Sequence, residues 1–251
     1  MANASNQIDR YTAFKNALTT FYNNCKEENS RYKSWEHCYE QFYLARNKNL
    51  NEKDYDSLCL HLAFYLASWG MLRNSFLLQR DYKIHNEVIK IILNNKYDCL
   101  LGASCKQVSE NWALLKDLKE EIEESYRVIR TKIPGYAEVD SKISDVLITK
   151  ILMGTLGCVP AYDRFFRETV TDSEYGEEGT YKIASGYFSK NSIKELYNFY
   201  DVHNDDLESI RKTMKIGEDI EYPQMKLIDM GFWQLGFEAK ERKKIEESNS
   251  V

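Results

Sequence analysis

The sequence is poor in residues that break helices or cross-link chains. Its 251 residues include only 3 prolines and 11 glycines, while hydrophobic residues make up 43% and charged residues 29%. That composition excludes a fibrous or disordered chain and predicts a globular chain of one or two domains that buries its own core. The 6 cysteines form no C-x-x-C pair, so we expect buried free thiols rather than disulfides or a metal site.

Long apolar runs and an excess of positive charge are also missing. The longest apolar run, residues 58–66, includes His61 and is far shorter than the roughly 20 residues of a membrane span. The N-terminus has no basic and apolar signal segments, so we expect a cytoplasmic protein with no membrane partner. Asp and Glu outnumber Lys and Arg by 39 to 34, which gives a net charge of −5. An excess of basic residues, which usually indicates nucleic-acid binding, is therefore absent.

Helical periodicity extends along most of the chain. Apolar residues recur at the spacing of one helix face, and no segment shows the alternation typical of strands with hairpin turns. We therefore predict an all-α fold, a helical bundle of two lobes with a cleft. The expected helices cover residues 10–22, 35–44, 54–69, 81–95, 109–130, 140–156, a short stretch ending at 167, 192–214 with a break at 201–206, and 223–247.

The connection at residues 132–140 is the candidate internal boundary, because it contains Pro134 and Gly135. It would divide the single domain, residues 1–251, into lobes of residues 1–133 and 134–251. A ligand site is expected in a cleft between such lobes.

Common catalytic signatures are absent from the sequence. It contains no P-loop, no G-x-G-x-x-G, no H-E-x-x-H and no G-x-S-x-G. The 4 histidines lie far apart and include no close metal-ligand pair. We therefore expect neither a metal nor a small-molecule cofactor.

Residues 145–166 carry the pattern most indicative of chemistry. Lys150 interrupts an apolar helix, and Asp163 follows the next turn in the first turn of another helix. Burial favours the neutral form of an amine, which is a nucleophile, and a helix N-terminus favours an ionised carboxylate. Such a carboxylate can stabilise positive charge that develops at a sugar C1′. The alternative is structural: a lysine whose ammonium reaches solvent, and an aspartate that starts a helix.

Thr149-Lys150-Ile-Leu followed by Val159-Pro160-Ala-Tyr-Asp163 resembles the core of the helix-hairpin-helix DNA glycosylase superfamily. The resemblance covers about 25 residues closely. It implies a two-lobed all-helical fold and double-stranded DNA with an extruded base as the partner. It also implies that Lys150 is the amine that attacks the sugar carbon and that Asp163 is the essential carboxylate.

The chain departs from the family pattern at two points. Residues 139–148 stand where the family has a glycine-rich hairpin that grips DNA phosphate, and Lys150 and Asp163 are only 13 residues apart. Shortened versions of this kind resemble divergent bacterial members, including ones found among phage-defence genes. That resemblance implies antiviral defence, with phage DNA carrying a hypermodified base such as glucosylated hydroxymethylcytosine as the substrate.

Two further segments have the residue types that stack on an extruded base and form hydrogen bonds with it. Within residues 68–79 these are Trp69, Arg73, Asn74 and Gln79, and near the C-terminus Asp229 and Trp233 share a helix face. The structural alternative makes residues 68–79 a capping turn and makes both tryptophans core residues.

Two other functions are consistent with the sequence. Arg80 and His85 match the R-x4-H pattern of all-helical HEPN ribonucleases, in which the histidine is an acid or base and the arginine holds phosphate. A helical interaction module without catalysis would explain the net acidity most simply.

Overall fold

The computed structural model describes residues 3–136, 142–171 and 182–249. It is predominantly helical, so the predicted all-α class is confirmed. The α-helices are α1 (Asn3–Lys26), α2 (Ser34–Ala45), α3 (Glu52–Ser68), α4 (Asn86–Ile92), α5 (Cys105–Glu110), α6 (Trp112–Arg130), α7 (Asp145–Thr155), α8 (Arg164–Thr171), α9 (Lys190–Val202), α10 (Asn204–Lys212) and α11 (Gln224–Asn249). Short 3-10 helices are η1 (Arg31–Lys33), η2 (Phe76–Gln79), η3 (Tyr82–His85) and η4 (Asn95–Leu100).

A small β-hairpin precedes α11, and the helical periodicity of the sequence did not predict it. Strands β1 (Lys215–Ile216) and β2 (Ile220–Glu221) pair antiparallel, with Ile216 opposite Ile220. Each strand has only 2 residues, which is too short for apolar alternation to be recognised in the sequence. The predicted break within residues 201–206 is present, because α9 ends at Val202 and α10 begins at Asn204.

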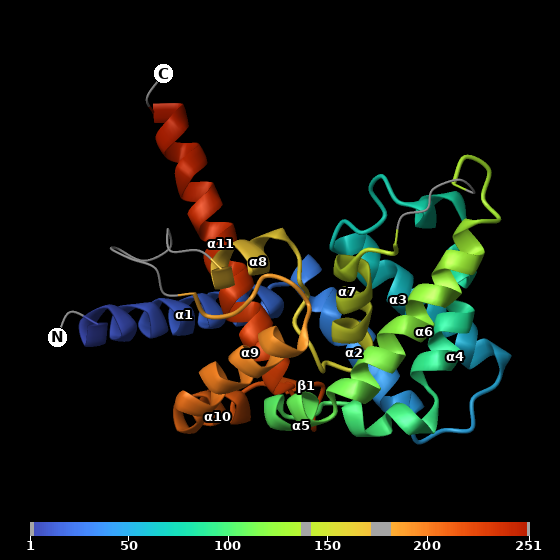
Figure 1. Ribbon diagram of the computed structural model, residues 1–251, viewed down its shortest axis with the longest axis horizontal. Helices are drawn as coiled ribbons and strands as arrows, with labels where there is room; N and C mark the ends of the chain where they lie inside the picture. Colours follow the sequence, from blue (N-terminus) through green and yellow to red (C-terminus); the bar gives the residue numbers. More distant parts are fainter. Residues whose placement is uncertain (1–2, 137–141, 172–181, 250–251) are drawn as a thin grey trace.

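The first and last helices lie side by side although they come from opposite ends of the chain (Figure 1). Helix α1 packs along α11, and α11 also packs against α8. In the other half of the molecule, α2 contacts both α3 and α7, and α6 packs against α4. The buried apolar residues of both groups join in one core cluster. The division into two lobes at residues 132–140 stays a prediction, and part of that connection, residues 137–141, lies outside the described residues.

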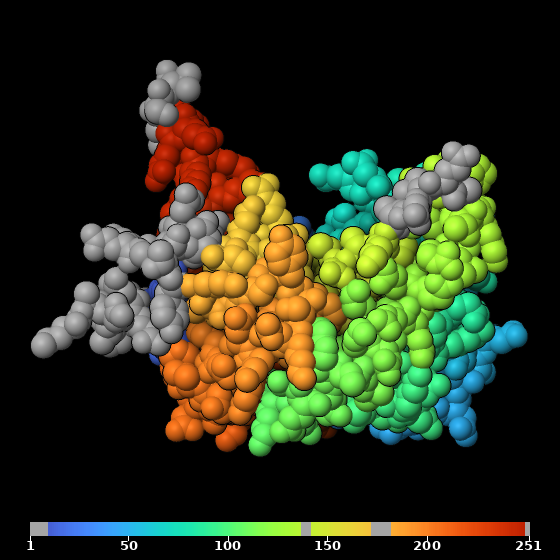
Figure 2. Space-filling model, viewed as in Figure 1, coloured from blue at the N-terminus to red at the C-terminus, as the bar shows by residue number. Residues whose placement is uncertain are grey.

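The surface is hollowed between these two groups of helices. Figure 2 shows a notch with the yellow and red atoms of α8 and α11 on one side and the teal segment that follows α3 on the other. Beyond this notch the C-terminal part of α11 extends away from the body of the molecule (Figure 1).

The cysteines are free thiols, and all except Cys99 are buried. The expectation of buried thiols is therefore wrong for Cys99, which is exposed just before the end of η4. Among the described residues, no helix has both the length and the apolarity that crossing a membrane requires.

Candidate active site

Helix α7 places a lysine inside the protein. The side chain of Ser144 caps the helix by accepting a hydrogen bond from the Leu147 N–H at 3.2 Å. The apolar residues that follow pack α7 against α2, α3 and α6, so the helix is buried on nearly every side. Lys150 lies in the middle of α7 and is only 4% exposed. Its side chain is therefore largely shielded from solvent, whereas the ammonium of a lysine at the edge of an apolar stripe usually reaches water.

The turn between α7 and α8 is fixed by side chains from two helices. The Ala161 N–H donates to Oδ1 of Asp229 on α11 at 2.9 Å, and the Tyr162 N–H donates to Oγ1 of Thr149 on α7 at 3.1 Å. Gly157 begins the turn with a φ of +64°, a conformation that favours glycine. A Cβ atom there would lie 2.4 Å from Cγ of Pro223. These contacts fix the backbone of the turn and therefore the position of Asp163.

Lys150 and Asp163 form a largely buried ion pair. The Lys150 ammonium donates to Oδ2 of Asp163 at 2.7 Å. The same oxygen accepts a hydrogen bond from the indole Nε1 of Trp233 at 3.1 Å. The other carboxylate oxygen accepts from the Phe166 N–H at 3.3 Å, so Asp163 also caps α8. The structure thus brings the two catalytic candidates into contact and adds Trp233 to them.

Trp69 and Trp233 contact this ion pair and belong to a group of packed aromatic side chains, which we call the aromatic cluster. Its members contact one another with ring centroids 4.8 to 6.1 Å apart. Trp69 and Trp233 meet edge to face at its centre, 5.2 Å apart, and the Lys150 ammonium lies 5.3 Å from the Trp69 ring centroid. The cluster comprises Phe21, Tyr32, Trp69, Phe165, Trp233 and Phe237.

A second buried ion pair lies behind the first. Lys226, 2% exposed, donates to Oδ2 of Asp229 at 2.9 Å. The Lys226 ammonium also faces the rings of Phe21, Trp35 and Trp69 at 4.7, 4.8 and 6.0 Å. Asp229 therefore has both carboxylate oxygens engaged inside the protein, one with Lys226 and one with the Ala161 N–H. In this structure it supports the turn rather than lining an open base pocket.

Arg73, Asn74 and Gln79 lie on the exposed segment that follows α3. Their side chains form no hydrogen bond or ion pair with any of the described residues. Asn74 has a φ of +55°, the left-handed conformation that asparagine tolerates better than most residues. The structure does not bring these three polar side chains into contact with the ion pair, whereas it does bring Trp69 there. That segment forms one wall of the notch in Figure 2.

The ribonuclease pattern is not assembled into an accessible site. His85 is 1% exposed, and its Nδ1 lies 2.6 Å from the Tyr126 hydroxyl. Burial lowers the pKa of His85 to about 4, so the imidazole is neutral at physiological pH. Arg80 is exposed and donates to the Lys132 carbonyl at 3.2 Å. A histidine enclosed in this way cannot reach a phosphodiester without rearrangement of the core.

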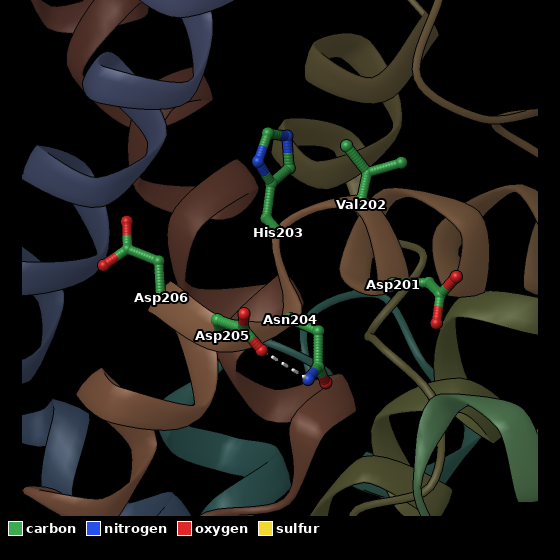
Figure 3. A pocket seen from close by; sticks show the side chains of 6 residues that line it. All are labelled: Asp201, Val202, His203, Asn204, Asp205 and Asp206. Atoms are coloured by element: carbon green, nitrogen blue, oxygen red, sulfur yellow. Dashed lines mark hydrogen bonds between the residues drawn. The ribbon is translucent and has the colours of Figure 1, made fainter.

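Two cavities elsewhere contain none of the predicted site residues. One, of about 260 Å³, is lined by residues 201–206 at the junction of α9 and α10 (Figure 3). The other, of about 340 Å³, lies between α1, α2 and β1 and is lined in part by the buried Glu36. Within the part of the chain that the structure describes, no group of His, Cys, Asp and Glu is arranged to hold a metal ion.

Sequence reasoning missed several residues of this site. Lys226 carries the same signal as Lys150, a lysine within an apolar helix segment, and could have been found by it. Tyr65 was also missed: burial raises the pKa of its hydroxyl, and the nearby carboxylates of Asp229 and Asp163 raise it further. Phe21 and Phe165 give no local signal, because only tertiary packing brings them to Trp69 and Trp233.

Comparisons with protein families, with curated proteins and with solved structures find no match for this chain.

Proposed function

We propose that the protein is a DNA glycosylase that releases a modified base and leaves an abasic site. The observation that carries this proposal is the ion pair of Lys150 and Asp163, held at 2.7 Å inside an aromatic cluster and bonded to Trp233. Amine, carboxylate and stacking faces are the groups that this reaction requires in one place. The resemblance of residues 149–163 to the helix-hairpin-helix glycosylases supports the same reaction.

The chemistry assigns a role to each partner of the ion pair. When the C1′–N bond breaks, its electron pair leaves with the base and positive charge develops at C1′. Asp163 would stabilise that charge. Lys150 would either attack C1′ and form a Schiff base or leave the attack to a water molecule. For the first route the ammonium must lose a proton to Asp163, which lies within hydrogen-bond distance. Asp163 must then pass that proton to the departing base, so that it is a carboxylate again when C1′ becomes positive. Neither route needs a metal or a cofactor.

The aromatic cluster would receive the extruded base. Stacking on an aromatic ring contributes about 1 to 3 kcal/mol per base and tolerates different bases. Trp69 is half-buried, so a base would reach its ring only after neighbouring side chains move. We place the approach of DNA to this site at the notch between α8 and the segment after α3 (Figure 2).

For the substrate we propose phage DNA that carries a bulky modified base, with glucosylated hydroxymethylcytosine as the specific candidate, and antiviral defence as the role. A sugar-bearing base needs polar partners beside a stacking face. Arg73, Asn74 and Gln79 are exposed, belong to the segment that forms one wall of the notch, and form no hydrogen bond or ion pair with other described residues. This part of the proposal rests chiefly on the resemblance to defence-associated glycosylases.

The proposal is tested by incubating the protein with duplex DNA that contains glucosylated hydroxymethylcytosine, hydroxymethylcytosine, cytosine, uracil or 8-oxoguanine. We expect abasic sites chiefly with the glucosylated base, and a covalent complex after borohydride reduction if Lys150 is the nucleophile. Lys150→Gln should then abolish the trapped complex. The matched control is Lys90→Gln, which removes a lysine from an exposed ion pair with Glu87 and should change nothing. A non-catalytic interaction module would yield no abasic sites from any of these substrates.

A further inference from the structure

An acidic glycosylase without the family's glycine-rich hairpin needs another way to hold DNA phosphate. The chain has a net charge of −5, so its overall field does not attract DNA. At the start of α7, the Leu147 N–H is already bonded to the side chain of Ser144. Cations close to the site are another means of binding phosphate.

Two such cations lie against rings of the aromatic cluster. The guanidinium carbon of Arg31, on η1, lies 5.4 Å from the Trp69 ring centroid. The ammonium of Lys240, on α11, lies 5.5 Å from the Phe165 ring centroid. Trp69 and Phe165 both contact Trp233, which is bonded to Asp163. The two cations therefore lie next to different rings that both contact Trp233. They come from elements that are distant in the sequence.

Neither cation forms an ion pair with a carboxylate of the described residues. Many lysines and arginines of this protein form ion pairs, for example Lys15 with Asp206 and Lys96 with Glu121. Arg31 and Lys240 form none with the described residues, and Arg31 is exposed. Each is also attracted to the face of its ring, which holds the charge beside the site.

Building on the proposed function, we infer that Arg31 and Lys240 bind the DNA phosphates on either side of the extruded nucleotide. The base would enter the aromatic cluster between them while its backbone stays at the surface. Contacts of this kind fix the position of the duplex and carry no sequence information. They would concentrate the attraction for phosphate at the site, so the remaining surface can stay acidic.

The test is the salt dependence of binding to a fluorescein-labelled duplex that carries one tetrahydrofuran abasic analogue. Neutralising one phosphate contact should reduce the slope of log K against log salt by about 1. We expect that reduction for Arg31→Gln and for Lys240→Gln, and about twice that for the double variant, with several-fold weaker binding at physiological salt. The matched control is the double variant Lys53→Gln, Lys212→Gln, which removes two exposed lysines that form no ion pair with the described residues.

Three outcomes distinguish this inference from the function on which it rests. A reduced slope in the Arg31 and Lys240 variants, with wild-type thermal unfolding and an unchanged slope in the control, supports the inference. If the wild type binds the duplex and the variants keep its slope, or the control loses as much, the inference is wrong and the glycosylase proposal stands. If the wild type does not bind the duplex at all, both are overturned.

Discussion

The indole Nε1 of Trp233 donates a hydrogen bond to Oδ2 of Asp163 at 3.1 Å, although the two residues lie 70 positions apart. This bond joins α11 to the turn before α8. The same carboxylate oxygen therefore accepts two hydrogen bonds, one from the indole and one from the Lys150 ammonium. A tryptophan expected to stack on a base thus also orients the proposed catalytic carboxylate.

Trp233→Phe keeps an aromatic ring in the cluster and removes the N–H donor. A hydrogen bond to a charged group contributes about 2 kcal/mol, so we expect a comparable loss in the free energy of unfolding and a roughly tenfold slower base release. Urea denaturation and single-turnover excision measure the two effects. Trp112→Phe is the control, since its indole has no hydrogen-bond partner among the described residues. Equal effects of both variants would show that the Trp233 bond is unimportant.

Asp229→Asn should be strongly destabilising. It leaves the Lys226 ammonium buried without its counterion, and breaking a buried pair costs about 3 to 5 kcal/mol. Adding Lys226→Met removes the unpaired charge and should restore much of the stability. The free energies of unfolding from urea titration of both variants give the comparison. A double variant no more stable than Asp229→Asn would contradict the role of Asp229 as the counterion.

Gly157→Ala tests whether the turn before Asp163 tolerates a Cβ atom at its first residue. An alanine at this position must adopt a left-handed backbone conformation, and its Cβ would lie 2.4 Å from the Pro223 ring. We therefore expect the free energy of unfolding to fall by about 2 kcal/mol or more. Gly70→Ala is the matched control, because Gly70 has a φ of +75° with nothing within 4 Å. It should lose only about 1 kcal/mol. Similar losses in thermal or urea unfolding would mean that the contact with Pro223 is relieved easily.

His85 makes stability depend on pH. Burial lowers its pKa to about 4 in the folded protein, whereas the unfolded chain binds the proton near the ordinary value of 6.5. The unfolded state therefore gains more protons as the pH falls from 6.5 to 4, and the stability falls with it. Between pH 7 and pH 5 the wild type should lose about 2 kcal/mol more than His85→Gln. Urea unfolding at the two pH values gives that difference, and equal losses would exclude a buried neutral histidine.

The HEPN alternative predicts instead that His85→Gln abolishes cleavage of RNA.

The part of the site that lies within one stretch of sequence was predictable. Lys150 is unusual because a charged residue interrupts an apolar helix, and Asp163 is placed by a proline-containing turn directly after it. Short sequence separation and helix geometry limit where these side chains can go. The long helix α6 was also predictable, since its apolar face repeats regularly from Leu115 to Ile129.

Partners contributed by distant elements were not predictable. The aromatic cluster forms because α1, α8 and α11 pack together, and no local pattern states that Phe21 and Phe165 both meet Trp233. The position of Asp229 was not predictable for the same reason. It was expected in the base pocket, but the depth at which α11 packs buries it beside Lys226.

The most direct test of the central claim is base release by Asp163→Asn compared with the wild type. Asparagine keeps the size of the side chain and removes the charge that would stabilise C1′. We predict that the wild type produces abasic sites in DNA containing glucosylated hydroxymethylcytosine and that the variant, with wild-type circular dichroism, is slower by about a hundredfold or more. Equal rates in the two proteins, or no abasic sites with the wild type, would contradict the account.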